Sequence, residues 1–234
     1  MVVTPELLSN FPILRPLPET VLSALASQCS LRKFNRRGVV LNAGVEEKAA
    51  CFLFEGRLQG VNFTIDGREV GLYFVKPGEF CGELGLFDYG LQPEYVIALT
   101  PSVVVFVPMS ALRDIMNKAP NVANTLGLKL ADRVRQMTFQ RTLLSLPNIS
   151  QRVCCQLWAL VPNKDKGTTA TTGAIVNPPT HMEIAIMLNV SRETVTRVFQ
   201  TLQKRQIVRR DGSTNLIINQ VKKLKDFAEG NDII

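Results

Sequence analysis

A short segment in the last third of the chain combines residue types that can read DNA bases. Arg192, Glu193 and Arg197 share one face of a helix that we predict from Ser191 to Gln206. The residues that recur at helical spacing on the opposite face are apolar: Val195, Val198, Phe199 and Leu202. An arginine can donate paired hydrogen bonds to guanine, and a glutamate can accept one from cytosine N4. Because a carboxylate would repel phosphates, Glu193 favours base reading in the major groove over adhesion to the DNA backbone.

Local signals on both sides of this segment predict a winged helix-turn-helix. Thr180 and Glu183 form a capping-box pattern that opens a short preceding helix, and Asn189 suits a left-handed turn between the helices. Ser191 then caps the second helix, and a hairpin wing is predicted over 207–218. The alternative is an ordinary helical hairpin with a solvated charged face. The cap, the turn, the apolar set and the wing together favour DNA binding.

Basic residues are concentrated in this C-terminal part. Residues 1–146 contain 15 Lys+Arg and 13 Asp+Glu, a net charge of +2, whereas residues 147–234 contain 12 and 7, a net charge of +5. The total of +7 favours a polyanionic partner. Arg209 and Arg210 of the wing, together with Thr196 on the polar helix face, are expected to contact phosphates.

Residues 31–108 consist of short apolar runs that are separated by turn signals, of which Asp66-Gly67 is the best hairpin turn. This spacing predicts an all-β barrel or a double-sheet roll, so the first third of the chain is expected to be mostly β. Such rolls also serve metal-dependent isomerases and oxygenases. Those sites need several histidines, and the single histidine of this chain, His181, lies outside the predicted roll.

From Ser110 the apolar pattern becomes helical, and a long helix is predicted after Pro120, to about Leu144. An apolar stripe recurs along it at nearly heptad spacing, at Leu126, Leu130, Val134 and Met137. Two interpretations remain open: the helix packs on its own β-domain, or the stripe is the seam of a homodimer. A length of about twenty-five residues with one narrow seam favours the dimer.

Leu146-Pro147-Asn148 interrupts this helix, because proline cannot continue the hydrogen-bond ladder. The chain is therefore divided into a β-roll sensor domain (1–109), a dimerisation helix region (110–146) and a winged helix-turn-helix DNA-binding domain (147–234). After the break, Asn148 is expected to cap a helix over 149–161. The polar residues 163–178 are predicted to form a loose hairpin that closes at 174–176.

The composition argues against several classes of protein. A hydrophobic content of 46% in 234 residues is enough for a folded core. Five cysteines without a C-x-x-C pair fit neither a disulfide framework nor a zinc site, which indicates a reducing cytoplasm. No apolar run reaches the length of a membrane span, and the first ten residues do not resemble a signal peptide. Catalytic nucleophile sets and phosphate-cradling glycine loops are missing from the sequence, so we expect no enzyme, no metal and no membrane partner; a small-molecule effector stays an open question.

Two motifs resemble the CRP/FNR family of transcription regulators. Residues 190–197, VSRETVTR, resemble the family's recognition helix, and residues 78–87, GEFCGELGLF, resemble the start of its phosphate-binding cassette. The resemblance covers nearly the whole chain and implies an α+β fold: a cyclic-nucleotide-binding-like β-roll, a long dimerisation helix and a C-terminal winged helix-turn-helix. It also implies a homodimer that binds a roughly two-fold, TGTGA-like operator in double-stranded DNA and contacts RNA polymerase.

The resemblance assigns roles to single residues. The family's base-reading positions correspond to Arg192, Glu193 and Arg197. Its phosphate-contacting positions correspond to Thr180, His181 and Ser191. Its ligand pocket corresponds to Gly82, Glu83, Leu84, Pro93, Glu94 and Thr138. The sequence departs from the family at Pro93 and Glu94, where an Arg-Ser or Arg-Thr pair holds the cyclic phosphate. Proline offers neither charge nor an amide donor, and glutamate would repel the anion, so cyclic AMP is not expected to bind in the family's pose.

Three hypotheses for the sensor remain open. The pocket is vestigial and the dimer binds DNA constitutively, or the roll binds another small molecule such as cyclic di-GMP, or a cysteine senses oxidants. A phosphate ligand would need cationic groups, and the candidates are Arg57, Arg68, Arg133 and Arg135. Cys51 and Cys81 lie in predicted strands, which favours buried, inert thiols. A regulatory module for a kinase or channel is a rival for the first 146 residues, but it leaves the winged helix unexplained.

Overall fold

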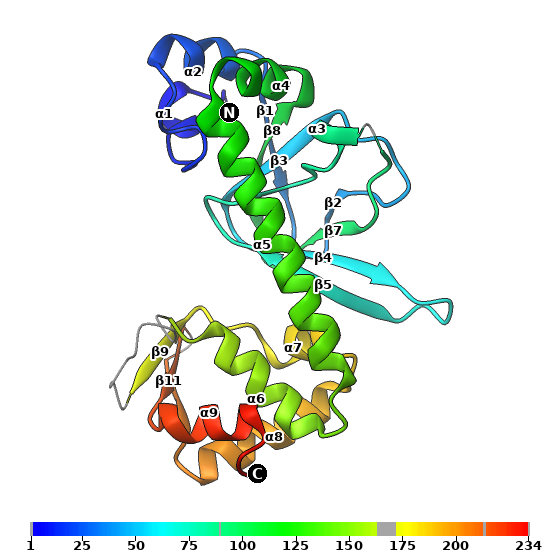
Figure 1. Cartoon of the computed structure of the whole chain (residues 1–234), viewed down its shortest axis with the longest axis vertical. Helices are drawn as coiled ribbons and strands as arrows, with labels where there is room; N and C mark the ends of the chain where they lie inside the picture. Colours follow the sequence, from blue (N-terminus) through cyan, green and yellow to red (C-terminus); the bar gives the residue numbers. More distant parts are fainter. Residues whose placement is uncertain (1, 89, 163–171, 213, 234) are drawn as a thin grey trace. The chain divides into compact units, whose positions relative to one another are not determined.

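Two four-stranded antiparallel sheets form the centre of the N-terminal unit of the computed structural model, which describes residues 2–88, 90–162, 172–212 and 214–233 (Figure 1). The strand order of one sheet is β1 (Ser30–Phe34), β8 (Ser102–Pro108), β3 (Ala49–Glu55) and β6 (Phe80–Cys81). The order of the other is β2 (Val39–Leu41), β7 (Tyr95–Ala98), β4 (Leu58–Phe63) and β5 (Glu69–Val75). The predicted double-sheet roll is thus confirmed.

The hairpin of β4 and β5 shows how local sequence shapes the roll. Its turn contains Asp66-Gly67, as predicted, and Gly67 has a φ of +78°, in the left-handed region that favours glycine. Gly60 on β4 lies opposite Tyr73 on β5. A Cβ on Gly60 would come within 2.5 Å of the Tyr73 ring. The absence of a side chain at Gly60 therefore allows Tyr73 to pack directly on the strand.

Helices precede, interrupt and follow the strands of the roll. These are α1 (Pro5–Leu8), α2 (Glu19–Ala26), α3 (Gly85–Asp88) and α4 (Met109–Lys118). The sequence did not predict α1 and α2, and the first third is less purely β than expected. The reason is that apolar residues before Ser30 enter the same core as the first sheet. Phe11 packs edge-on against Phe52 with ring centroids 5.1 Å apart, and Phe52 stacks on Phe80 at 5.2 Å.

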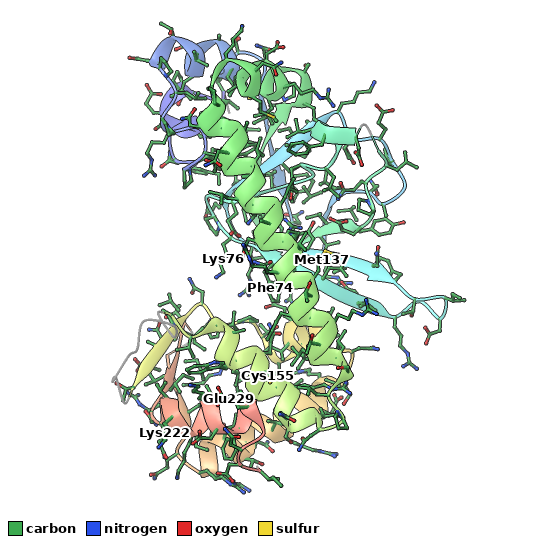
Figure 2. The ribbon with its side chains drawn as sticks, viewed as in Figure 1. Phe74, Lys76, Met137, Cys155, Lys222 and Glu229 are labelled. Atoms are coloured by element: carbon green, nitrogen blue, oxygen red, sulfur yellow. The ribbon has the colours of Figure 1, made fainter. Side chains whose placement is uncertain are left out.

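The long helix α5 (Pro120–Ser145) confirms the predicted helix. Leu126 was predicted to lie in a dimer seam, and this was wrong: it is 1% exposed because it packs in the core of its own unit. Leu130 is half-buried, whereas Val134 and Met137 are 63% and 56% exposed. Met137 is labelled in Figure 2. The start of the apolar stripe therefore packs on the roll, and the seam formed by its exposed remainder stays a prediction.

The chain divides into two units, Met1–Met137 and Thr138–Ile234. This division falls within α5, because the last turns of that helix pack with the second unit. Gln140 donates a hydrogen bond to the carbonyl of Met187, and Leu143 belongs to the C-terminal core. The three-part organisation with boundaries after residues 109 and 146 stays a prediction. Within the described ranges, no helix has the length and apolar character needed to cross a membrane.

The C-terminal unit consists of helices packed with a small antiparallel sheet. The helices are α6 (Ile149–Leu160), α7 (His181–Leu188), α8 (Arg192–Lys204) and α9 (Val221–Glu229). The strand order is β10 (Val208–Asp211), β11 (Asn215–Ile218) and β9 (Gly173–Val176). Of the predicted hairpin closing at 174–176, the closing segment forms β9, which pairs with β11 and places the buried Ile175 opposite Leu216; the hairpin itself stays a prediction. Residues 163–171 of that prediction lie outside the described ranges.

Helix ends in this unit follow local signals. Asn148 caps α6 by accepting a hydrogen bond from the Gln151 amide at 3.2 Å, as predicted. Helix α8 ends at Lys204, before the predicted end at Gln206, because Gln206 has a φ of +57° and leaves the helical conformation. Cys155 of α6 and Glu229 of α9, both labelled in Figure 2, belong to helices that pack against each other.

Candidate DNA-binding surface and effector region

The turn between α7 and α8 has the geometry that the sequence predicted. The Glu183 amide donates to Thr180 Oγ1 at 3.3 Å, and the Thr180 amide donates to Glu183 Oε2 at 2.9 Å, which completes the capping box. Asn189 is left-handed, with φ 51° and ψ 50°. Ser191 Oγ accepts from the Thr194 amide at 3.1 Å and caps α8. These local bonds fix the angle between the two helices.

Helix α8 has one buried and one charged face. The buried face belongs to the C-terminal core and comprises Val195, Val198, Phe199 and Leu202. Arg192, Glu193 and Arg197 are exposed, so the structure brings together the three predicted base-reading residues. Among the residues that the structure describes, the two arginines form no ion pair. Their guanidinium groups are therefore available to a partner.

His181 and Thr196, both predicted to contact phosphates, instead contact each other. His181 Nδ1 lies 3.0 Å from Thr196 Oγ1, and the Thr196 hydroxyl donates to the Arg192 carbonyl at 2.9 Å. The imidazole also packs on the Phe199 ring, with centroids 4.3 Å apart. His181 Nε2 is buried and has no hydrogen-bond partner in the described part of the chain. Both side chains are thus engaged with each other in the structure, and their predicted phosphate contacts stay a prediction.

The remaining predicted phosphate contacts are exposed. Thr180 and Ser191 lie at the N-terminal caps of their helices. In the wing, Arg209 pairs with Asp211 at 3.7 Å, and both side chains are more than half exposed. An exposed pair at this distance contributes little, so Arg209 can exchange it for a phosphate. Arg210 is exposed on the same strand.

A polar cluster occupies the roll where the sequence implied a ligand pocket. We call Tyr73, Glu83, Glu94 and Arg133 the roll cluster. The Arg133 guanidinium lies 3.4 Å from the Tyr73 ring centroid, and its Nη2 lies 3.4 Å from Glu83 Oε1. The Tyr73 hydroxyl donates to Glu94 Oε1, which also accepts from Gln92 Nε2 at 3.0 Å. Arg133, from α5, is thus the cation that faces both carboxylates of the pocket region.

Burial sets the protonation of this cluster. Glu83 and Glu94 are 3% and 7% exposed. Desolvation raises the pKa of the Glu94 carboxyl, although the Tyr73 hydrogen bond and the Arg133 charge oppose this shift. Desolvation also raises the pKa of Tyr73. The roll cluster contains one guanidinium, that of Arg133, and it is already paired with the Glu83 carboxylate. A cyclic phosphate that entered this region would have to compete with Glu83 for it.

The other predicted pocket residues do not join this cluster. Gly82 is buried, and a Cβ there would lie 2.8 Å from a Leu41 methyl group. Leu84 and Pro93 are exposed. Thr138 belongs to the second unit, and its contact with a ligand stays a prediction. Sequence reasoning missed Tyr73 altogether and named Arg133 only as one of several candidate cations.

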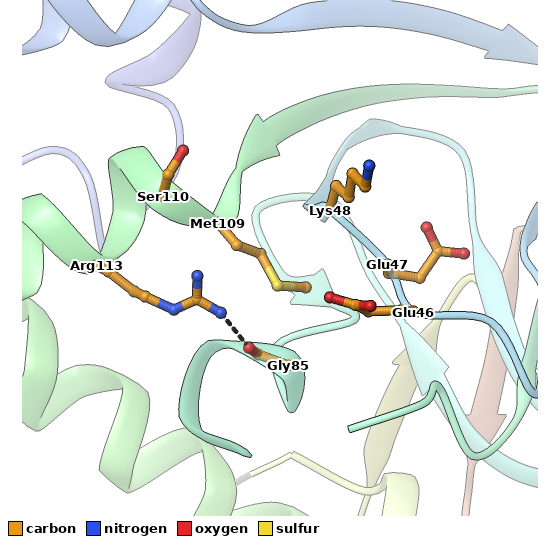
Figure 3. Close-up of a pocket in the computed structure, with 7 residues that line it drawn as sticks. All are labelled: Glu46, Glu47, Lys48, Gly85, Met109, Ser110 and Arg113. Atoms are coloured by element: carbon orange, nitrogen blue, oxygen red, sulfur yellow. Dashed lines mark hydrogen bonds between the residues drawn. The ribbon is translucent and has the colours of Figure 1, made fainter. Parts of the chain in front are cut away.

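A pocket beside α3 measures about 260 Å³ (Figure 3). Its lining residues are Glu46, Glu47, Lys48, Gly85, Met109, Ser110 and Arg113. Arg113 already donates to the carbonyls of Gly85 and Leu86, as the dashed line to Gly85 indicates. None of the predicted ligand residues lines this pocket, so it does not take over the role of the implied nucleotide site.

The cysteines offer no exposed reactive pair in the roll. Cys51 and Cys81 face each other across β3 and β6 and are fully buried. Burial raises the pKa of the Cys51 thiol well above its ordinary value, which lowers its reactivity. Across the described ranges, no group of three or more His, Cys, Asp or Glu side chains is arranged to hold a metal ion.

Both halves of the chain match known domains. Residues 31–119 match the family model of the cyclic nucleotide-binding domain, and residues 151–227 match that of the Crp-like helix-turn-helix domain. The chain belongs to the CRP/FNR family of transcription regulators. As a CRP/FNR member, it is a DNA-binding transcription regulator that carries a cyclic nucleotide-binding domain.

Relatives of this CRP/FNR protein are transcription regulators rather than enzymes. The cAMP-activated global transcriptional regulator Vfr of Pseudomonas aeruginosa is 28% identical over 200 residues, which cover 84% of this chain and 92% of Vfr. A CooA mutant from Carboxydothermus hydrogenoformans shares the fold with a TM-score of 0.75, at 15% identity, over 94% of this chain and 95% of that one. The c-di-GMP responsive regulator CLP of Xanthomonas campestris aligns with a TM-score of 0.63 at 20% identity, over 82% of this chain and 94% of CLP.

Proposed function

We propose that this regulator is a homodimer that reads a pseudo-palindromic, TGTGA-like operator with α8. The observation that carries the proposal is the two-faced character of that helix. Arg192, Glu193 and Arg197 are exposed, while the opposite face is anchored in the core of the unit. A helix held in this way can present base-specific donors and an acceptor in the major groove without losing packing.

Each polar group then has a distinct task at the DNA. Arg192 and Arg197 donate to guanine O6 and N7, and Glu193 accepts from cytosine N4. Thr180, Ser191, Arg209 and Arg210 contact phosphates and set the register of the domain on the duplex. Only the base contacts of Arg192, Glu193 and Arg197 distinguish one DNA sequence from another.

The exposed part of the α5 stripe supports the homodimer. Val134 and Met137 are more than half exposed, and Leu130, on the same side of the helix, is half-buried. Pairing two copies along this stripe would cover these side chains. A two-fold dimer presents two recognition helices to half-sites about one turn of DNA apart. The dimer then recruits or blocks RNA polymerase at the promoter.

We propose that DNA binding does not depend on cyclic AMP. The roll cluster supports this, because Glu83 already pairs with Arg133 and Glu94 with Tyr73. Pro93 and Glu94 replace the groups that would hold a cyclic phosphate. The second candidate is control by another small ligand, such as cyclic di-GMP. The fully buried Gln59 amide, whose oxygen and nitrogen have no partner among the described residues, favours it.

Selection from a random duplex library tests the reading mode. The full-length protein is incubated with the library without nucleotide, and bound DNA is amplified and sequenced over several rounds. We expect enrichment of two inverted TGTGA-like half-sites with a fixed spacing of about one helical turn. Enrichment of no motif, or of a single unpaired half-site, would contradict the proposed function.

A further inference from the structure

A chain of contacts links the start of α7 to the first turn of α8. His181 Nδ1 lies 3.0 Å from Thr196 Oγ1, and Thr196 Oγ1 lies 2.9 Å from the Arg192 carbonyl oxygen. The same imidazole packs on Phe199, a residue of the buried face of α8. His181 therefore contacts α8 at two points, one turn apart along the helix.

These contacts define the tautomer of the imidazole. A carbonyl oxygen can only accept, so the bond between Thr196 and Arg192 uses the hydroxyl hydrogen of Thr196. With that hydrogen assigned to the carbonyl, we infer that the Thr196 oxygen accepts from His181 and that the histidine proton lies on Nδ1. Nε2 is left unprotonated, buried and without a partner in the described ranges.

The charged surroundings favour this neutral state. Arg192 on α8 and Arg210 on β10 face the imidazole, while Glu183 on its own helix is engaged in the capping box. Burial, and then the charges of Arg210 and Arg192, lower the pKa of His181 below its ordinary value. A proton on Nε2 would add a buried donor without an acceptor beside two cations.

We propose that His181 is a positioning residue that acts through Thr196 to fix the first turn of α8 and thereby the direction of Arg192. This inference rests on the proposed base-reading function of Arg192. It replaces the phosphate contact that the sequence implied for His181, because neither ring nitrogen can donate to a phosphate in this arrangement.

Acid should disrupt this arrangement. The folded protein holds His181 with a lowered pKa, so the unfolded chain takes up the proton first as the pH falls. The neutral imidazole is fully favoured above the ordinary value of about 6.5. As the pH falls through the lowered value, Nε2 takes up the proton; Nδ1–H stays a donor, but the buried Nε2–H without an acceptor in the described ranges destabilises the packing of the ring on α8. Specific DNA binding should weaken over the same range, relative to nonspecific binding.

The tautomer can be measured without DNA. His181 is the single histidine of the chain, so a long-range ¹H–¹⁵N spectrum of the full-length protein contains one imidazole. We expect the Nδ1–H tautomer at pH 7.5. The Nε2–H tautomer, or rapid exchange between both, would overturn the proposal independently of any DNA result.

Binding of a TGTGA-type palindrome and a scrambled duplex tests the positioning role. Thr196→Val and His181→Leu should each lose about threefold to tenfold on the palindrome at pH 7.5, as expected for one hydrogen bond, and little on scrambled DNA. His181→Asn should retain binding, because its amide nitrogen can replace Nδ1 as donor. The matched control is Thr201→Val, which removes an equivalent hydroxyl bond to the Arg197 carbonyl, 3.1 Å long, on the same helix.

The pH profile separates positioning from direct contact. Between pH 7.5 and 5.5, the ratio of specific to nonspecific affinity should fall for the wild type and stay flat for His181→Asn. An unchanged wild-type ratio with tighter binding of both duplexes in acid would show a direct phosphate contact and overturn the proposal, as would equal losses in Thr196→Val and Thr201→Val. No preference for the palindrome in the wild type would refute the base-reading function itself, whereas the tautomer spectrum would still report on the contact.

Discussion

Arg197→Ala should remove one base contact from each half-site and leave the fold intact. The side chain is exposed and has no ion pair among the described residues. The backbone bond that its carbonyl accepts from Thr201 Oγ1 does not involve the guanidinium. Alanine also has a high helix propensity. The whole loss should therefore appear in DNA binding, as about 1–3 kcal/mol per half-site for a bidentate contact to guanine. For one half-site this equals roughly 5- to 150-fold, at about 1.4 kcal/mol for each factor of ten, and a homodimer on the palindrome loses this factor twice.

Fluorescence anisotropy measures this loss on the palindrome and on variants with one base pair changed in each half-site. The discrimination at one position should disappear in Arg197→Ala, while the other positions keep theirs. The matched control is Arg209→Ala in the wing, which should weaken all duplexes alike and reduce the salt slope by about two, one for each protomer of the dimer. An equal loss of Arg197→Ala on random DNA would refute the base-reading role.

Three further substitutions or measurements test other parts of the account. Val134→Asp should break the dimer by placing a charge in the seam. Leu128→Asp should not, because Leu128 is equally exposed but lies about 120° around the helix. Light scattering measures the mass of each variant, and an unchanged mass for Val134→Asp would contradict the seam. Arg133→Ala should lower the free energy of unfolding by about 3–5 kcal/mol, because Glu83 would stay buried without its cation. Urea denaturation measures this, and an unchanged midpoint would show that the ion pair is not formed. Burial raises the pKa of the Cys29 thiol to about 11. Alkylation of Cys29 should therefore be slow at pH 8 and accelerate about tenfold per pH unit up to pH 10. An alkylation rate equal to that in denaturant would contradict the burial of this thiol.

Sequence patterns predicted the features that neighbouring residues determine. The capping box at Thr180, the left-handed turn at Asn189 and the hairpin turn at Gly67 depend on side chains and backbone angles within a few residues. The two faces of α8 follow from helical periodicity. These signals were sufficient for the candidate DNA-binding surface, because a helix-turn-helix is assembled from adjacent segments.

Contacts between distant segments could not be predicted in this way. Heptad spacing placed Leu126 and Val134 in one stripe, but periodicity does not tell which partner covers each residue. Arg133 lies on a helix otherwise rich in exposed polar residues, and its pairing with Glu83 spans 50 positions of sequence. The bond between His181 and Thr196 depends on the packing of α7 against α8. The sequence therefore did not predict the partners of side chains that tertiary packing brings together from distant segments.

The most direct test is an anisotropy titration of the full-length protein against a TGTGA-type palindrome and a scrambled duplex, at one stated salt concentration, with and without cyclic AMP. We expect the protein to bind the palindrome at least about a thousandfold more tightly than the scrambled duplex, as specific regulators do, and cyclic AMP to change neither affinity. Equal affinity for both duplexes would contradict base reading by α8. A preference that requires cyclic AMP would contradict the proposal that DNA binding does not depend on this nucleotide.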